Sequence, residues 1–210
     1  MKKKMDQKLA KAMAVGFLVS MVVACATIPE LEVRYTLPAP EHGLRGMRVS
    51  FRFEDARQGS SFLAERAREA LPHFPGTIYF SVATKGGSGD RLGLFRPEEM
   101  VKEAFERRLK AMGMIVTPGS PGSGEPELHI VLNEFLLDVA NRRWVATVAY
   151  EASLRKRGTV LSTQSIRAQS ERLKLIGWDE ANSTLSEVFS DSVNRLDFVE
   201  LFRQGGIPIP

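Results

Sequence analysis

Apolar and polar residues alternate in the segment MRVSFRFE, residues 47–54, and this alternation predicts a β-strand. Apolar side chains share one of its faces, namely those of Met47, Val49, Phe51 and Phe53. A period of two is typical of a strand with one buried face. Residues 77–84 are also expected to be extended, whereas residues 84–93, TKGGSGDRLG, are expected to form a flexible loop.

Two longer segments repeat apolar residues at spacings of three and four, which predicts two amphipathic helices. The first covers residues 97–112 and ends at Gly113, and its stripe consists of Val101, Ala104, Phe105, Leu109 and Met112. The second covers residues 179–202, with the stripe Ala181, Leu185, Val188, Phe189, Val193, Leu196 and Val199. A shorter helix is expected near residues 61–71, before Pro72.

Three strand-like runs between residues 127 and 172 predict an antiparallel meander with tight turns at Arg142 and at residues 157–158. The first run loses its alternation at residues 133–136, which predicts a bulge or bend. The expected order of elements is β-α-β-β-β-β-α, with the extra short helix near residues 61–71. We therefore predict an α+β fold: a two-layer domain whose mainly antiparallel sheet carries two principal amphipathic helices on one face.

The N-terminus has the pattern of a secretory signal. Residues 1–11 are rich in lysine, and residues 12–24, AMAVGFLVSMVVA, are uncharged. Thirteen residues rise about 20 Å as a helix, less than the roughly 30 Å of a bilayer core, so a permanent spanning helix is the weaker interpretation. The residues before Cys25 are small or apolar, as at a cleavage site.

The segment VVAC, residues 22–25, resembles a bacterial lipobox. This resemblance implies cleavage before Cys25, a diacylglycerol on its thiol and an acyl chain such as palmitate on its amine. Three chains would anchor the protein essentially permanently. In enterobacterial lipoproteins an aspartate after the cysteine favours retention in the inner membrane. This chain has Ala26 at that position, which implies a location in the outer membrane. An ordinary secreted protein with a chance cysteine is the alternative.

These patterns divide the chain into four parts. We predict a lipoprotein signal peptide over residues 1–24, an acylated cysteine with a flexible tether over residues 25–44, a single α+β domain over residues 45–204 and a tail over residues 205–210. The tether is expected because Pro29, Pro38, Pro40 and Gly43 interrupt it.

The formal charge of +4 disappears when the predicted signal is removed. Residues 1–24 hold five of the 29 basic and one of the 25 acidic side chains, which leaves 24 of each. A mature chain without net charge lacks the overall basic character of nucleic-acid-binding proteins. We therefore expect no nucleic-acid partner, and the sequence does not indicate an oligomeric state.

No motif in the sequence indicates catalysis. Glycines 87, 89 and 93 are spaced G-x-G-x-x-x-G, one residue too long for a dinucleotide-binding loop. In the G-x-S-x-G pattern of a hydrolase nucleophile, Ser88 has Asp90 in place of the second glycine and Ser123 has Pro121 in place of the first. No H-E-x-x-H or C-x-x-C pattern is present. We expect no enzyme activity, cofactor or metal, and an enzyme built on dispersed carboxylates is the alternative.

Two basic clusters outside the signal are candidates for partner binding: Arg142 with Arg143, and Arg155 with Lys156 and Arg157. They could meet anionic head groups or glycan carboxylates, or they could simply solubilise the tips of hairpins. Asp55 and Arg57 end the first strand and are a third candidate, for which a local ion pair that fixes the turn is the alternative.

Several of these features together resemble the YajG-like family of bacterial outer-membrane lipoproteins. They are the lipobox, a strand ending in D-x-R at residues 55–57, the helix AFERRLKAMG with its following strand at residues 104–116, the L-x-I-x-L pattern at residues 128–132, the meander and the long last helix. Residues 60–93 depart from the family pattern. The auxiliary lipoproteins of ABC-type lipid transport share the size and element order.

The resulting hypothesis is a non-catalytic, lipid-anchored cell-envelope protein, held in the outer membrane by acyl chains on Cys25 and facing the periplasm. Its domain would bind an envelope protein or polymer as a binding or scaffold module. An accessory lipoprotein of an ABC-type lipid transport system is the alternative, and it would differ by an apolar groove for acyl chains.

Overall fold

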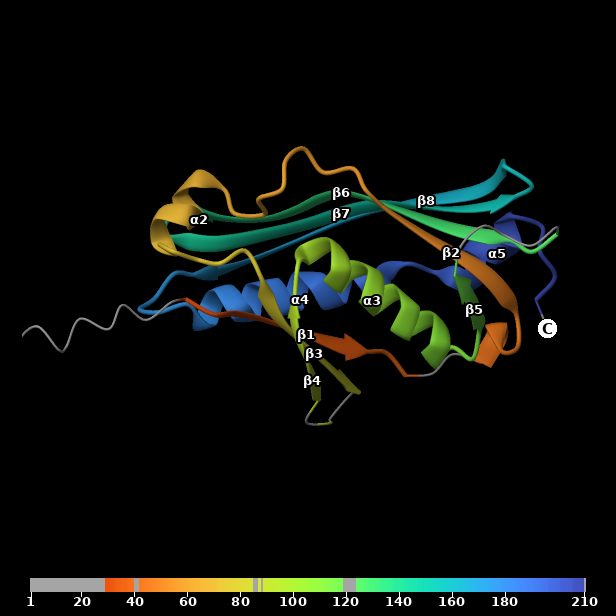
Figure 1. The fold of residues 1–210 in the computed structure, drawn as a ribbon, viewed down its shortest axis with the longest axis horizontal. Helices are drawn as coiled ribbons and strands as arrows, with labels where there is room; N and C mark the ends of the chain where they lie inside the picture. The colour runs from red at the N-terminus through yellow and green to blue at the C-terminus, as the bar shows by residue number, and fades with distance from the viewer. Residues whose placement is uncertain (1–28, 40–41, 85–86, 88, 119–123, 210) are drawn as a thin grey trace, which may run out of the picture.

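The computed structural model describes residues 29–39, 42–84, 87, 89–118 and 124–209. Over these residues the chain has an α+β fold, as the sequence predicts, but its strands form two sheets instead of one. Figure 1 shows the long strands of the larger sheet on one side of the molecule and the smaller sheet on the other, with two helices between them.

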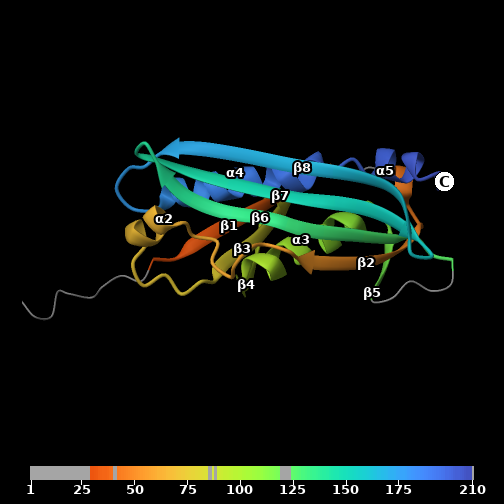
Figure 2. The ribbon, with the colours of Figure 1, turned by 90° about the horizontal axis from the view of Figure 1, so that it is seen from above.

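The larger sheet contains five strands in the order β5-β2-β6-β7-β8. The three long strands β6 (Glu127–Ala140), β7 (Arg143–Lys156) and β8 (Thr159–Leu173) form the predicted antiparallel meander. Strand β2 (Arg48–Asp55) pairs in parallel with both β6 and β5 (Ile115–Pro118). Figure 2 shows that the meander runs along the length of the molecule.

The turns and the bulge of the meander follow from local backbone chemistry. In the two-residue turns at 141–142 and 157–158, all four residues have positive φ angles, between 49° and 79°. Such turns match the twist of the strands that they join. The pairing of β6 with β7 shifts between Leu132 and Glu134, so Asn133 is an extra residue, and the predicted irregularity at residues 133–136 is confirmed.

The smaller sheet has the order β1-β3-β4. Strand β1 (Leu31–Leu37) is parallel to β3 (Ile78–Thr84), which is antiparallel to β4 (Asp90–Phe95). The extended segment expected near residues 77–84 is therefore confirmed. The prediction of a loop throughout residues 84–93 is wrong, because the backbone from Asp90 onwards pairs with β3.

Helices α3 (Pro97–Ala111) and α4 (Asp179–Arg195) are the two predicted amphipathic helices, and α2 (Glu65–Ala70) is the predicted short one. The helix expected over residues 179–202 is interrupted, because Leu196 is extended and the Asp197 side chain accepts a hydrogen bond from the Glu200 N–H at 2.8 Å. Asp197 thus caps a separate helix, α5 (Phe198–Gln204). A 3₁₀ turn covers His42–Leu44.

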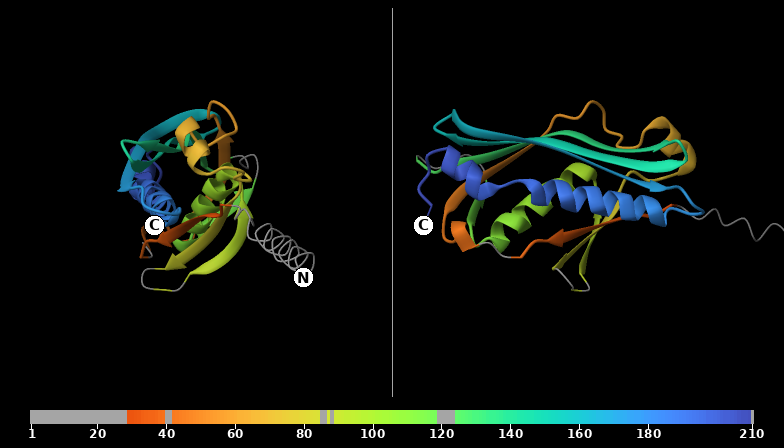
Figure 3. Two further views of the ribbon diagram at one scale, coloured as in Figure 1. Left: turned by 90° about the vertical axis from the view of Figure 1, so that its left-hand side faces the viewer. Right: turned by 180° about the vertical axis from the view of Figure 1, so that it is seen from behind.

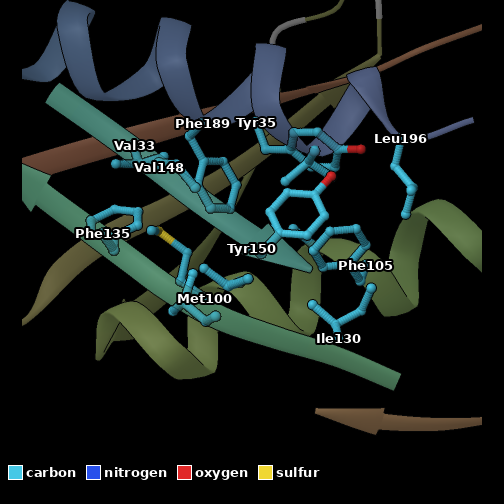
Figure 4. Packing of buried hydrophobic residues seen from close by; sticks show 14 of the residues in the cluster. Val33, Tyr35, Met100, Phe105, Ile130, Phe135, Val148, Tyr150, Phe189 and Leu196 are labelled. Carbon is cyan, nitrogen blue, oxygen red and sulfur yellow. The ribbon is translucent and has the colours of Figure 1, made fainter. Parts of the chain in front are cut away.

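The core lies between the two sheets. Helices α3 and α4 each contact strands of both sheets, and the buried apolar side chains of the described residues form one cluster. Phe189 of α4 stands near its centre and makes edge-to-face contacts with Tyr35, Phe80 and Phe135, whose ring centroids lie 5.8, 5.8 and 6.2 Å away. Figure 3 shows the helices between the two sheets from the end of the molecule, and Figure 4 shows Phe189, Tyr35 and Phe135 from close by.

Strand β1 is held to α4 by side chains that follow the helix at steps of four residues. The N–H groups of Glu32, Arg34 and Thr36 donate to the side chains of Asn182, Ser186 and Ser190, at 2.9, 2.9 and 3.1 Å. Four helical residues rise about 6 Å and two strand residues about 6.6 Å, so the two series stay in register. The free edge of β1 is thereby satisfied along its length.

This strand corrects the predicted tether and domain boundary. Residues 31–37 are a strand and not a flexible linker, and their alternate residues Leu31, Val33 and Tyr35 are fully buried. The folded domain therefore begins before residue 45. The predicted tail also contributes to the fold, because Ile207 and Ile209 pack partly against the core.

Candidate functional site

The two predicted basic clusters lie at opposite ends of β7. Arg143 pairs with Leu173 at one end of the β7–β8 ladder, and Lys156 pairs with Thr159 at the other. The 13 residue steps between Arg143 and Lys156 correspond to about 43 Å of strand. A small partner therefore cannot contact both clusters at once.

The end with the β6–β7 turn is tied to the segment that follows β8. The guanidinium of Arg143 forms an ion pair with Glu171 at 2.7 Å. The carbonyl of Arg142 accepts a hydrogen bond from the Lys174 N–H at 2.8 Å. The ammonium of Lys174 lies 5.8 Å from the ring centroid of the buried Trp144. The backbones of Arg142 and Lys174 are thus brought together, although 32 positions separate the two residues in the sequence.

The other end carries the β7–β8 turn. Arg155 is half-buried and its Nε donates to the hydroxyl of Ser153 at 3.2 Å, whereas Arg157 is exposed at the turn itself. Within the described residues, neither Lys156 nor Arg157 forms an ion pair with a carboxylate. This end therefore presents uncompensated positive charge to the solvent.

Asp55 and Arg57 form a local ion pair, which the sequence analysis gave as the alternative to partner binding by these residues. Arg57 donates to both carboxylate oxygens of Asp55 at 2.8 Å and to Glu98 of α3 at 2.9 Å. The hydrogen bond from Arg57 lowers the pKa of Asp55 below its usual value. Because the Arg57 side chain is only 5% exposed, the pair fixes the end of β2 against α3 and presents little free charge.

The connection from β2 to β3 forms a pocket that sequence reasoning did not identify. The pocket has a volume of about 400 Å³; its apolar lining includes Phe62, Leu71 and Phe74, and its polar lining includes Arg68 and His73. Backbone hydrogen bonds join this connection to Leu137 of β6. Its size is within the range of small-ligand sites. The only sequence signal was the departure of residues 60–93 from the family pattern.

His129 of β6 is a second feature that the sequence did not indicate. The side chain is buried, and its Nε2 lies 3.1 Å from a carboxylate oxygen of Glu54. Burial, followed by the charges of Arg155 and Arg52, lowers the pKa of His129. The lowered pKa favours the neutral imidazole at pH 7, and a neutral ring with its proton on Nε2 can donate to the Glu54 carboxylate.

Three other residues that the sequence analysis considered lie outside the described residues. Cys25 lies outside them, as do Ser88 and Ser123. Among the described residues, no three His, Cys, Asp or Glu side chains form a group that could hold a metal ion. None of the helices over these ranges has the length and apolar character needed to cross a membrane.

No family model matches the chain, and no curated protein matches its sequence. Three solved bacterial structures are similar to it in fold. A Xanthomonas campestris protein of the family model DUF330 is 12% identical, with 85% of this chain and 94% of that chain covered and a TM-score of 0.48. A minor lipoprotein from Acinetobacter baumannii is 9% identical, with coverage of 78% and 97% and a TM-score of 0.39.

A proposed lipoprotein from Caulobacter crescentus is 11% identical, with coverage of 50% and 78% and a TM-score of 0.35. All three TM-scores are below 0.5, so none of these proteins transfers a function to the chain. The resemblance to the YajG-like family stays a prediction.

Proposed function

We propose that the protein is a non-catalytic lipoprotein of the bacterial cell envelope, anchored in the outer membrane through Cys25 and facing the periplasm. Its domain acts as a binding module for an envelope protein or polymer. The observation that supports this proposal best is the position of β1, which is the first strand of the described residues and begins only six residues after Cys25.

The short connection limits the distance between the domain and the bilayer. Six residue steps span at most about 20 Å when fully extended. Since β1 is buried in the core and bonded to α4, it cannot serve as additional tether. An anchor on Cys25 would therefore hold the start of β1 close to the membrane, and the domain would have a preferred end towards it.

This geometry gives the two basic clusters different surroundings. The start of β1 lies beside the start of α4, because Glu32 bonds to Asn182 in the first turn of that helix. The β6–β7 turn lies at this same end, and the β7–β8 turn lies about 43 Å away along the strand. The uncompensated charge of Lys156 and Arg157 then faces away from the membrane, where an acidic protein or an anionic polymer can bind it.

Lipidation is tested on the protein produced in a bacterial host. We expect intact-mass analysis to show a mature chain that begins at Cys25 and carries the mass of its acyl chains. The Cys25→Ser variant should remain an unlipidated full-length precursor, because the thiol that accepts the lipid is missing. Cleavage at another position without a lipid adduct would refute the anchor.

Partner binding is tested with the double variant Lys156→Glu and Arg157→Glu, which leaves the half-buried Arg155 in place. Affinity capture from envelopes at low salt should recover several-fold less of the specific partner than the wild type does, and salt should reduce the difference. The control Arg66→Glu, an exposed charge on α2, should leave capture unchanged. If the double variant recovers as much partner as the control does, Lys156 and Arg157 only solubilise the turn.

The pocket beside α2 favours a second candidate function, an accessory role in ABC-type lipid transport. Its walls of Phe62, Leu71 and Phe74 are suited to an apolar group, and Arg68 could pair with an anionic one. The same capture experiment distinguishes the two functions. A permease, a substrate-binding protein and stoichiometric lipid in the captured material would favour transport, whereas a structural envelope component would favour the binding module.

A further inference from the structure

The segment that joins β8 to α4 exposes a cluster of large aliphatic side chains. Leu173, Leu175 and Ile176 are 58%, 62% and 102% exposed. Elsewhere in the described part of the chain only Leu94, Ile115 and Val160 are comparably exposed: Leu94 lies on β4, Ile115 on β5 and Val160 at the far end of β8. Single exposed apolar residues are common on protein surfaces, but three within four positions indicate a contact surface. We call residues 173–176 the aliphatic tip.

Basic side chains flank the aliphatic tip. Lys174 lies within it, and the backbone hydrogen bond between Lys174 and Arg142 places the β6–β7 turn beside it. Neither Arg142 nor Lys174 pairs with a carboxylate among the described residues, whereas the neighbouring Arg143 and Arg172 pair with Glu171 and Glu187. The half-buried Trp178 follows at the start of α4. Exposed aliphatic residues with adjacent cations and a tryptophan are typical of segments that lie in a membrane interface.

The aliphatic tip also lies at the end of the domain from which the chain leads to Cys25. Helix α4 begins three residues after Ile176, and its Asn182 bonds to Glu32 at the start of β1. Figures 1 and 3 show the start of β1 and the connection between β8 and α4 at the same end of the molecule. A bilayer within about 20 Å of β1 is therefore within reach of the tip.

We propose that the aliphatic tip inserts into the membrane that holds the N-terminus, with Leu175 and Ile176 among the acyl chains and Arg142 and Lys174 at anionic head groups. The choice of the membrane, and not a protein, as the partner rests on the proposed anchor at Cys25 and on the charge of the flanking residues. The tip is then a second contact point, which fixes the domain relative to the bilayer and directs the β7–β8 turn away from it.

The test compares two labelled positions in the full chain, reconstituted in vesicles of phosphatidylethanolamine and phosphatidylglycerol. Cys25 is the only cysteine and is acylated in the proposed form, so Ile176→Cys accepts a fluorescent nitrobenzoxadiazole label specifically. Val160→Cys is the matched control, because Val160 is 52% exposed and lies at the opposite end of β8. We expect aqueous dithionite to quench the label at 176 about tenfold more slowly than the label at 160.

A third labelled position tests whether protection depends on the side chains of the tip or on the label itself. Leu173→Cys should be protected in the wild-type tip and should lose its protection when Leu175→Asp and Ile176→Asp are added, because charged side chains disfavour insertion. These three positions are exposed, so the substitutions leave the core intact. Equal quenching at 176 and 160 would overturn the proposal. Protection of 176 in the absence of vesicles would also overturn it, because a protein surface would then cover the tip.

Intact-mass analysis of the same samples separates this proposal from that of the anchor. A lipid adduct on Cys25 together with an unprotected label at 176 would refute the inserted tip alone. Absence of a lipid adduct from the chain would refute the anchor, and a protected label at 176 on the Cys25→Ser background, which has no second thiol, would still support the tip.

Discussion

A chain that starts at residue 38, after β1, is expected to lose cooperative folding, whereas a chain that starts at residue 29 should keep it. Strand β1 fills the core with the fully buried side chains of Leu31, Val33 and Tyr35. Burial of the two aliphatic side chains alone contributes about 3–6 kcal/mol, against a net stability of about 5–15 kcal/mol for a typical domain. Removal of β1 also exposes Phe189 and leaves β3 without its parallel partner.

Near-ultraviolet circular dichroism and urea unfolding of the two chains measure this difference. A pair of point variants provides the matched control: Val33→Asp should destabilise the chain strongly because it buries a charge, and Arg34→Asp should have little effect because Arg34 is exposed. Cooperative unfolding of the chain that starts at residue 38 would show that residues 25–44 can act as a tether after all.

The sequence contained the signal for β1, since Leu31, Val33 and Tyr35 alternate with Glu32 and Arg34. The flanking prolines and the nearby lipobox favoured the interpretation as a tether. The pairing of β1 with β3 joins residues 47 positions apart in the sequence, and no local pattern specifies such a contact. The same reason explains why the sequence predicted one sheet, because the division into two depends on which distant strands pair.

The parts of the candidate site that depend on neighbouring residues were predictable. The turns at 141–142 and 157–158 follow from local turn chemistry, and their basic residues lie where the strand pattern places them. The aliphatic tip was not predicted, because its position beside Arg142 and β1 depends on how β8 and α4 pack. The sequence predicted the ion pair of Arg57 with Asp55 but not the one with Glu98, because Glu98 is 41 residues away.

Arg108 is a buried charged residue that the apolar stripe of α3 did not predict. It occupies a position on the buried face of α3, four residues after Ala104 and three after Phe105, and only 3% of its surface is exposed. Its guanidinium donates to the carbonyl oxygens of Val193 and Leu196, the latter at 2.7 Å, and lies 4.6 Å from the ring centroid of Phe198. These contacts satisfy carbonyls at the C-terminal end of α4 and hold the junction of α4 and α5 against α3.

The substitution Arg108→Met is therefore expected to lower the free energy of unfolding by about 3–5 kcal/mol, because methionine fills the space but leaves the buried carbonyls of Val193 and Leu196 without these donors. Arg108→Lys should recover little of this loss, since one ammonium cannot reproduce the planar fork that reaches both oxygens. The adjacent Arg107 is the matched control. It forms only a surface pair with Glu103 at 2.6 Å, so Arg107→Met should cost less than about 1 kcal/mol. Urea unfolding of the three variants measures the differences, and equal losses for Arg107→Met and Arg108→Met would show that Arg108 does not hold the α4–α5 junction.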